Sequence, residues 1–429
     1  MKTIFKNATL LPEYGFADRA FVTVEGKRIT AIESQMPSAD SDTEVIDCNG
    51  NLLMPAFYNA HSHAAMTLFR GYGEDLPLQR WLDERILPAE DRLTYQSVFW
   101  GTKWAIAEML RGGVVSFSDM YMFEDAVADA VLETGIKSNV SRSLVSFDPE
   151  IDMTTDHRMA EAIELFNRYH GADDGRLLVD MALHAEYTNV PRACAFVGEF
   201  AASHGLRMQL HLSETELEHA KCIARHTKTP TRFFNDLGVF DVPTTAAHCV
   251  WVDDEDIGIL ASKKVSVVHN PISNLKLGSG VMPLSKMLAA GVNVALGTDG
   301  TASNNRLDLL REMQTAAILH KGILRDPACT TAKEMLPLAT VNGALAQGRT
   351  DCGRLAVGYR ADLILLNRES IHNIPVYDDY AMLAYSAERS DVLMTMVDGR
   401  ILYRNNEYTL IDEERLRYEC KEIFAHYFD

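Results

Sequence analysis

Short apolar runs alternate with longer amphipathic stretches through the middle of the chain. Eight such runs follow one another: "LLMPAFYNAHSH", "GGVVSFSDM", "IKSNVSRSL", "RLLVDMALHAEY", "RMQLHLSE", "TTAAHCVW", "KVSVVHNP" and "VNVALGTDG". Each run has the length of a strand, and the stretches between them are long enough for helices. Eight apolar strands that alternate with helices are what an α/β barrel requires. The sequence therefore predicts a (β/α)8 TIM-like barrel over residues 56–354.

The two ends of the chain carry a different pattern, of short stretches typical of β-strands. "MKTIFKNATLLP" and "AFVTVEGKRITAIES" precede the predicted barrel, whereas "ADLILLNRE" and "VLMTMVDGRILYRNNEYTL" follow it. The segments "VEGKR" and "VDGR" indicate hairpin turns within these stretches. We therefore expect residues 1–55 and 355–429 to form one small β-sandwich domain together.

Composition narrows the class of protein. A formal net charge of −19 argues against nucleic acid as a partner. No apolar run approaches the roughly 20 residues of a membrane span, and the N-terminal segment lacks the apolar core of a signal peptide. The seven cysteines are scattered and never form a Cys-x-x-Cys motif, a pattern typical of reduced thiols. These features favour a cytoplasmic protein that acts on a small molecule, and they leave open whether it is a homo-oligomer.

Two histidines lie two residues apart at the end of the first predicted strand. The spacing of His61 and His63 in "NAHSH" points both imidazoles to the same side of an extended strand. Taken alone, such a pair is more often two polar residues that reach solvent or a backbone carbonyl than a metal site. The residues at the ends of the other predicted strands distinguish the two interpretations.

Polar residues also end other predicted strands: His211 the fifth, His248 the sixth and Asp299 the eighth. The active site of such a barrel lies at these strand ends, and chance rarely places so many histidines there. His61, His63, His211 and Asp299 would supply nitrogen and carboxylate ligands and leave one position open for water. The set favours one divalent ion, Zn²⁺ first and Fe²⁺ as the alternative.

Seven segments, in order along nearly the whole chain, resemble a known family: "NAHSHAAMTLFRGYGEDLPLQRWL", "LPAEDRLT", "HLSETE", "AAHCV", "HNPISNLKLGSG", "LGTDGTASNN" and "GYRADLILLN". The resemblance is to the metal-dependent amidohydrolases and, within them, to the S-adenosylhomocysteine/5′-methylthioadenosine deaminases. In dinuclear members of the superfamily a lysine on the fourth strand bridges two metals. The fourth strand here, "LLVDMALHAEY", has no lysine, which favours a single metal.

The resemblance implies hydrolytic deamination of an adenosine-type nucleoside to the inosine form, with release of ammonia. Asp299 would take a proton from metal-activated water, while His248 would orient the hydroxide and stabilise developing charge. Glu214 would protonate the ring nitrogen beside the attacked carbon. Without the resemblance, Glu214 could as well be a carboxylate that caps the helix of "SETELEHA" together with Ser213.

Four further residues match substrate contacts of the resembling family. Trp81 would stack near the purine, Glu90 would hold the ribose hydroxyls, and Arg142 and His184 would line the same pocket. Each has a plain alternative: a core aromatic, a helix-start acid, a surface ion pair and a satisfied strand-end imidazole, respectively.

The segment after the seventh strand holds several polar residues of less certain purpose. Asn270, Ser273 and Asn274 could contact substrate, but Asn and Ser beside a proline are ordinary turn residues, so we expect them to shape the loop. His269 is expected to support the ligands rather than to be one.

The sequence departs from the family after the third strand. The resemblance leads us to expect an additional arginine there for the homocysteine carboxylate, but "SLVSFDPEIDMTTD" has none, and Arg158 is the nearest later candidate. Methylthioadenosine, 5′-deoxyadenosine and adenosine therefore become at least as good candidates as S-adenosylhomocysteine. Glu186 has no firm counterpart in the family and could tune specificity or face solvent.

Three alternative functions remain to be weighed. Guanine, a pterin or a triazine would require the same ligands and the same proton transfers. A cytidine-deaminase-type fold is disfavoured, because its His-x-Glu and Pro-Cys-x-x-Cys signature is absent. A non-catalytic barrel scaffold should lack some of the six metal and catalytic residues, and none is missing here.

Overall fold

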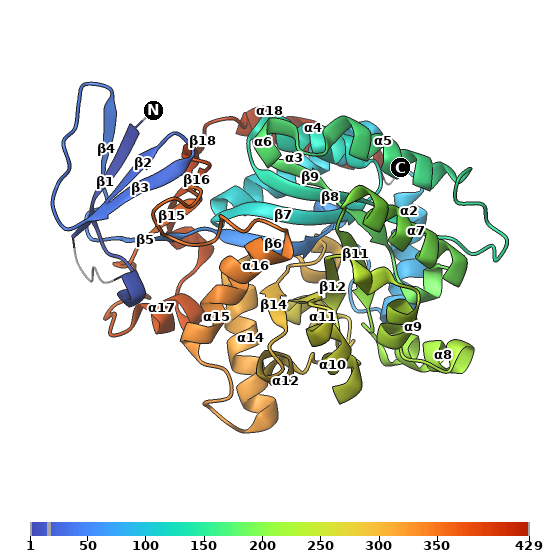
Figure 1. The fold of residues 1–429 in the computed structure, drawn as a ribbon. Coiled ribbons are helices and arrows are strands. Elements are labelled where there is room, and N and C mark those ends of the chain that lie inside the picture. Colours follow the sequence, from blue (N-terminus) through green and yellow to red (C-terminus); the bar gives the residue numbers. More distant parts are fainter. Residues whose placement is uncertain (1, 15–18, 428–429) are drawn as a thin grey trace.

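The computed structural model describes residues 2–14 and 19–427 as a barrel with two smaller sheets beside it (Figure 1). The barrel strands are β6 (Phe57–Ser62), β7 (Val114–Tyr121), β8 (Lys137–Leu144), β9 (Leu177–Val179), β10 (Met181–Leu183), β11 (Met208–Leu212), β12 (Thr244–His248), β13 (Ser266–His269) and β14 (Asn293–Leu296). They follow the order β6-β7-β8-β10-β11-β12-β13-β14, and neighbours are parallel. Asp299 N donates to the carbonyl of His61 over 3.0 Å and so joins the last strand's loop to the first strand. The predicted (β/α)8 fold is confirmed.

Helices cover the outside of the barrel between the strands. The longer ones are α3 (Tyr95–Arg111), α4 (Glu124–Thr134), α5 (His157–Tyr169), α7 (Pro191–His204), α8 (Glu216–His226), α9 (Pro230–Asp236), α10 (Asp254–Ser262), α14 (Leu309–Leu324) and α15 (Ala332–Ala339). Short helices and turns complete the connections: η2 (Ala64–Phe69), α1 (Leu78–Trp81), η3 (Leu82–Ile86), α2 (Leu87–Glu90), α6 (Ala172–Gly175), η4 (Glu186–Thr188), η5 (Val239–Asp241), α11 (Pro271–Lys276), α12 (Leu284–Ala289), α13 (Thr301–Asn304) and α16 (Val341–Ala346).

Local sequence signals account for these helices, as α3 illustrates. Thr94 and Ser97 form a capping box at its start, which satisfies backbone N–H groups that have no partner within the helix. Val98, Ile106 and Met109 recur at helical spacing and are buried.

The first predicted strand divides where the chain passes from one sheet to another. Ala56 N donates to the carbonyl of Asp362, whereas Phe57 N donates to the carbonyl of Gly113, each over about 3 Å. Successive N–H groups of an extended chain point to opposite edges, so β5 (Leu52–Pro55) joins a chain-end sheet while β6 joins the barrel. The fourth predicted strand is likewise interrupted at Asp180, between β9 and β10.

The chain ends build two sheets that face each other. The first contains β1 (Lys2–Ala8), β2 (Ala20–Glu25), β3 (Arg28–Glu33) and β4 (Thr43–Asp47), in the order β3-β2-β1-β4; η1 (Pro12–Tyr14) follows β1. The second contains β5, β15 (Leu363–Leu366), β16 (Val392–Val397), β17 (Arg400–Arg404) and β18 (Glu407–Tyr408), in the order β18-β17-β16-β15-β5. Apolar side chains of both sheets, among them Phe5, Val22, Leu363 and Met396, form one buried cluster. A sandwich made from both chain ends is thus present.

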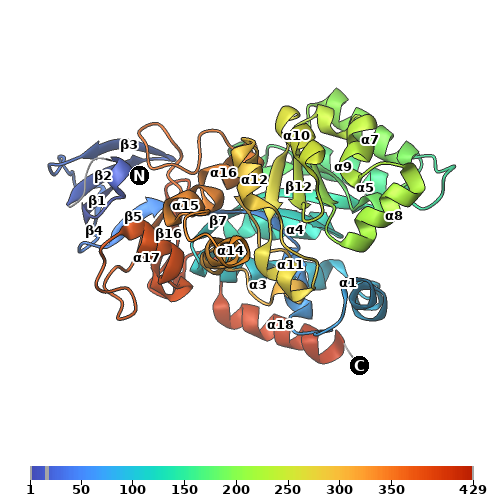
Figure 2. The ribbon, with the colours of Figure 1, turned by 90° about the horizontal axis from the view of Figure 1, so that it is seen from below.

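The C-terminal segment also contains helices. After β15 come α17 (Asp379–Tyr385) and η6 (Arg389–Asp391), and α18 (Glu413–Tyr427) lies along α3 on the flank of the barrel (Figure 2). The boundaries 1–55 and 355–429 therefore stay a prediction, because part of the second segment packs on the barrel. Among the described residues, none of the helices combines the length and apolarity needed to cross a membrane.

Candidate active site

A cavity of about 580 Å³ opens where the barrel strands end. Its walls bring together all predicted site residues except His61: His63, Trp81, Glu90, Arg142, His184, His211, Glu214, His248 and Asp299. His61 lies directly beside them, because its ring centroid is 4.9 Å from those of His63 and His211. Residues that are far apart in the sequence therefore converge as the strand-end pattern predicts.

Four side chains bring possible ligand atoms close together. The Nε2 atom of His63 lies 3.3 Å from Nε2 of His211 and 3.2 Å from Oδ1 of Asp299. Nε2 of His61 is 3.7 Å from the same carboxylate oxygen and, although buried, has no hydrogen-bond partner among the described residues. Three histidine nitrogens lie within 4.8 Å of one another. An unpartnered buried nitrogen that faces two imidazoles and a carboxylate fits a divalent cation.

Backbone carbonyls orient two of these imidazoles. Nδ1 of His63 lies 2.6 Å from the carbonyl of Met120, and Nδ1 of His211 lies 2.7 Å from the carbonyl of His184. A proton on each Nδ1 leaves the Nε2 lone pair free for a metal. Burial lowers the pKa of His61 and of His211 well below the usual value, so both imidazoles stay neutral, as ligands must be.

Two serine hydroxyl groups hold the carboxylate of Asp299 in place. Its Oδ2 accepts from Ser273 Oγ at 2.6 Å and from Ser303 Oγ at 3.0 Å. Its backbone adopts a left-handed conformation, with φ of 60°. A Cβ at position 297 would lie 2.5 Å from Asn270 Oδ1, so only glycine lets the backbone just before Asp299 pass this close to Asn270. Although burial opposes it, the neighbouring histidines, His63 first, hold the pKa of the Asp299 carboxyl well below its usual range.

His248 and Glu214 lie next to each other in the wall of the cavity. Nδ1 of His248 lies 2.8 Å from Asn274 Oδ1, and its Nε2 lies 3.9 Å from Glu214 Oε2. The carboxyl of Glu214 also accepts from Ser279 Oγ at 3.2 Å. Burial raises the pKa of Glu214, which favours a protonated carboxyl in a position to donate.

The helix that follows Glu214 is capped by other residues. Thr215 accepts from Glu218 N and caps α8. The alternative role of Glu214, capping this helix together with Ser213, is therefore not seen. The Glu218 carboxylate accepts from the backbone N–H groups of Ser213, at 3.1 Å, and Glu214, at 2.7 Å. Ser213 itself is left-handed, with φ of 48°. Glu218 therefore fixes the turn that directs Glu214 into the cavity.

The predicted substrate residues line one side of the cavity. Trp81, on α1, is a buried aromatic residue that borders the cavity. Glu90 ends α2 instead of starting a helix, and its Oε1 accepts from Tyr121 Oη at 2.7 Å. Burial raises the pKa of Glu90 to about 7. His184 Nδ1 lies 3.0 Å from Thr188 Oγ1, and Arg142 pairs with Glu161 at 2.5 Å while also bordering the cavity.

Several residues of the site were missed by sequence reasoning. Asp119 lies two residues before the end of β7, is fully buried and accepts from the backbone N–H of Ala64 at 2.8 Å, directly after His63. Its position near a strand end was a usable signal. Tyr121 and the apolar mouth of the cavity, which includes Met122 and the 70% exposed Phe147, gave no signal in the sequence. Arg158, by contrast, was named from the sequence as the nearest later arginine; it lies near the start of α5 and lines the cavity.

The polar residues after the fourth and seventh predicted strands are all buried: Glu186, His269, Ser273 and Asn274. Glu186 does not face solvent: it is buried and pairs with Arg225 and with His226, whose Nε2 is 2.9 Å from Oε1. His269 lies outside the ligand group and contacts His320, with 3.2 Å between their Nε2 atoms. Asn274 and Ser273, expected to shape the loop, also bond to His248 and Asp299, respectively.

A model of the amidohydrolase family matches residues 52–402. The chain belongs to the amidohydrolase family. This amidohydrolase is 44% identical over 378 residues to a 5-methylthioadenosine/S-adenosylhomocysteine deaminase of Dictyoglomus thermophilum, which covers 88% of each chain. It is 42% identical over 422 residues to a 5′-deoxyadenosine deaminase of Methanosarcina mazei, covering 98% of this chain and 96% of that one. An adenosine deaminase structure from Xanthomonas campestris, with bound zinc, superposes with a TM-score of 0.91 at 32% identity, covering 99% and 98% of the two chains.

Proposed function

We propose that this amidohydrolase is a cytoplasmic, metal-dependent deaminase that converts the 6-amino group of an adenosine-type nucleoside to the inosine form. The observation that carries the proposal is the pairing of two groups in one cavity. One is the cluster of three histidines and Asp299, and the other is Glu214, whose pKa is raised by burial and which lies beside His248. The deaminases at 42–44% identity support the same reaction class.

The donor set suits a single Zn²⁺, with Fe²⁺ as the alternative. His61, His63, His211 and Asp299 would hold the ion, because their ligand atoms converge and the Nε2 atom of His61 has no other described partner. When bound, such an ion lowers the pKa of water, so that hydroxide is available near neutral pH.

The side chains of the chain itself move the protons of the reaction. Asp299 accepts a proton from the attacking water, and His248 orients the nucleophile and stabilises the charge that develops. The carboxyl of Glu214 protonates the ring nitrogen next to the attacked carbon. As the carbon–nitrogen bond to the amino group breaks, the proton held by Asp299 passes to the amine, which leaves as ammonia, and the proton of the new hydroxyl returns to Glu214.

The remaining walls suit a nucleoside. We assign Glu90 to the ribose hydroxyls, Trp81 to the face of the purine, and His184 and Arg142 to its surroundings, since all four border the cavity. Met122 and Phe147 make the mouth apolar, which suits a 5′-methylthio or 5′-deoxy group. Arg158 supplies the cation that a carboxylate tail would need, so S-adenosylhomocysteine remains among the candidate substrates despite the missing arginine after the third strand.

The proposal is tested by incubating the metal-replete protein with methylthioadenosine, 5′-deoxyadenosine, adenosine, S-adenosylhomocysteine and guanine. Ammonia release and the change in purine absorbance report turnover. We expect turnover of the adenosines, its loss after chelation and its return with added Zn²⁺. In Arg158→Gln we expect the KM to rise for S-adenosylhomocysteine alone. Turnover of guanine with none of the adenosines would contradict the proposed ring.

A further inference from the structure

A second cavity, of about 350 Å³, lies outside the active site between α3, α18 and the loop after α13. Figure 2 shows α18 running along α3, and the cavity borders both helices. Its distinguishing feature is its arginines, which come from five separate parts of the chain: Arg70, Arg111, Arg306, Arg389 and Arg417. Two carboxylates, Glu108 and Glu413, share the lining.

The cations of this cavity exceed its carboxylates. Glu108 pairs with both Arg70, at 2.5 Å, and Arg389, at 3.0 Å, so one negative charge faces two positive ones. Arg111 bonds to the neutral amide of Asn406, at 3.3 Å, and has no ion pair with the described part of the chain. Arg306 is exposed and has no ion pair with the described residues either. Such a concentration of positive charge stands out in a chain of net charge −19.

Aromatic side chains form part of the same wall. Trp104 is half-buried and borders the cavity, and so does Tyr408, whose hydroxyl donates to the carbonyl of Ala107 at 2.9 Å. Guanidinium groups bind phosphate oxygens through paired, planar hydrogen bonds, and an indole face can stack on a base. We propose that this cavity, which we call the arginine cavity, binds a phosphate-bearing anion, either inorganic phosphate or a nucleotide.

The arginine cavity touches the outer ends of two of the segments that carry metal-ligand candidates, those after His63 and Asp299. Arg70 directly follows η2, the turn that begins after His63. Asn305 directly follows α13, which begins two residues after Asp299, and the Arg70 guanidinium donates to the carbonyl of Asn305. An anion bound by these residues would therefore restrain both loops from outside the active site.

The binding test uses the metal-replete enzyme and two probes, inorganic phosphate and uridine monophosphate, titrated calorimetrically. The pyrimidine avoids a purine site. We expect saturable binding of one anion per chain, weakened at least tenfold in Arg111→Ser/Arg306→Ser, because two charged donors are lost. Arg192→Ser/Arg354→Ser removes the same charge from exposed positions outside this cavity and should leave the affinity unchanged.

Hydrogen exchange locates the bound anion. We expect the ligand to slow amide exchange in residues 64–75 and 300–308 of the unmodified enzyme, but not of the Arg111→Ser/Arg306→Ser variant. Tighter binding of uridine monophosphate than of phosphate would identify a nucleotide as the better ligand, and equal affinities would identify phosphate. Absence of saturable binding, equal affinity in both double variants, or protection confined to the active-site strands would overturn the proposal.

Discussion

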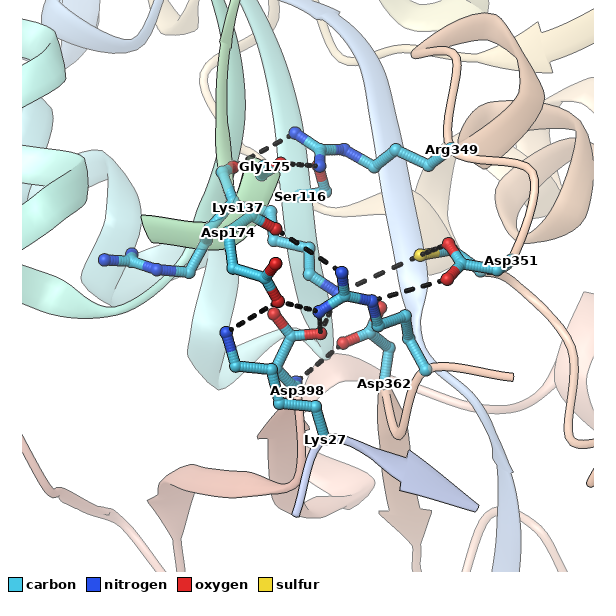
Figure 3. A network of polar contacts seen from close by, with 12 residues as sticks. Lys27, Ser116, Lys137, Asp174, Gly175, Arg349, Asp351, Asp362 and Asp398 are labelled. Carbon is cyan, nitrogen blue, oxygen red and sulfur yellow. Dashed lines mark hydrogen bonds and ion pairs between the residues drawn. The ribbon is translucent and has the colours of Figure 1, made fainter. Parts of the chain in front are cut away.

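Two clusters of buried titratable side chains lie at opposite ends of the same barrel, and they differ in how their charges are paired. At the carboxyl ends of the strands lie the metal-ligand candidates and Glu214. At the amino ends lies a network around Lys137, the first residue of β8 (Figure 3). Both are shielded from solvent, so what separates them is how completely the chain itself pairs each charge.

The network around Lys137, which we call the lower network, pairs its charged side chains with one another. The ammonium of Lys137 contacts Asp362 and lies 2.7 Å from Oδ1 of Asp398. Tyr58 donates to Asp362, and Arg360 lies 3.5 Å from Asp398. Although burial opposes both shifts, these partners raise the pKa of Lys137 and lower that of Asp362. Both groups stay charged, and together they tie the barrel to the chain-end sheets.

The metal-ligand candidates, Glu214 and the residues around them at the carboxyl ends of the strands, which we call the upper cluster, include polar groups without a partner. Nε2 of His61, Oδ2 of Asp119 and Oδ1 of Asn270 are buried without a hydrogen-bond partner in the described part of the chain. Burial raises the pKa of Glu214, and that of Glu218 to about 8. Unpaired polar groups cost stability, and a bound ion or substrate would supply partners for those that lie in the candidate site. The comparison predicts that changes at the upper end alter activity, whereas changes at the lower end alter stability.

The largest expected effect is the loss of activity in Glu214→Gln. An amide cannot supply the proton to the ring nitrogen, so we expect kcat to fall by about 10²–10⁴-fold. The free energy of unfolding should stay the same or rise, because a buried carboxyl is replaced by a neutral group. Steady-state kinetics and urea unfolding measure the two effects, with the exposed Glu216→Gln as the control. A kcat within tenfold of the original would contradict the assignment.

Lys137→Met should show the opposite result. Removing the ammonium leaves Asp362 and Asp398 buried without it, so we expect the free energy of unfolding to fall by about 3–5 kcal/mol. The kcat/KM of the folded fraction should not change. Urea unfolding measures the loss, and Lys263→Met, which breaks an exposed pair with Asp241, should cost under about 1 kcal/mol.

A double variant checks the cause of that loss. Lys137→Met/Asp362→Asn removes both members of the pair, and Asp398 keeps Arg360 as a partner. Stability should recover in part, because less uncompensated charge remains buried. If the double variant is as unstable as the single one, lost packing around the Lys137 stem is the cause and charge pairing is not.

The fold could be predicted largely from the sequence, because apolar strands and amphipathic helices leave periodic signals along the chain. The division between β5 and β6 could not, since "LLMPAFYNAHSH" is one continuous apolar run and only its hydrogen-bond partners change. The interruption at Asp180 was also missed. Its carboxylate accepts from the side-chain amides of Asn139 and Gln209 inside the barrel, and no local pattern indicates such partners.

The candidate site residues at the ends of strands could be predicted from the sequence. Polar residues at successive strand ends indicated His61, His63, His211, His248 and Asp299 because parallel strands end on one face. The residues that hold them were not apparent, since Asn274 and Ser279 come from loops whose course the sequence does not specify. The lower network was missed for the same reason: Lys137 and Asp362 are 225 positions apart, and each looks ordinary in its own strand.

Stability at the upper end should depend on pH through Glu312, which accepts from Ile272 N and Asn304 Nδ2 behind Asp299. Burial raises its pKa from 4.5 to about 8. Between these values the folded chain keeps a proton that the unfolded chain releases, so this group makes stability fall as pH rises. The slope is at most about 1.4 kcal/mol per pH unit.

Glu312→Gln removes this proton, so the decline in unfolding free energy between about pH 5 and 8 should become shallower by that amount. Urea unfolding across this range measures the slope, and the exposed Glu414→Gln should leave it as it is. An unchanged slope in Glu312→Gln would mean that the carboxyl is ionised in the folded protein.

The smallest expected effect is that of Asn274→Ala, which separates orientation from chemistry within the upper cluster. Asn274 Oδ1 is the acceptor that lies 2.8 Å from Nδ1 of His248, and its loss frees the imidazole to turn or to change tautomer. We expect kcat/KM to fall about tenfold with the metal content unchanged. Asn274→Asp retains an acceptor oxygen at the same place and should recover most of the activity. If alanine and aspartate behave alike, the packing around His248 positions it without help from this bond, and the upper cluster needs fewer supporting contacts than its geometry indicates.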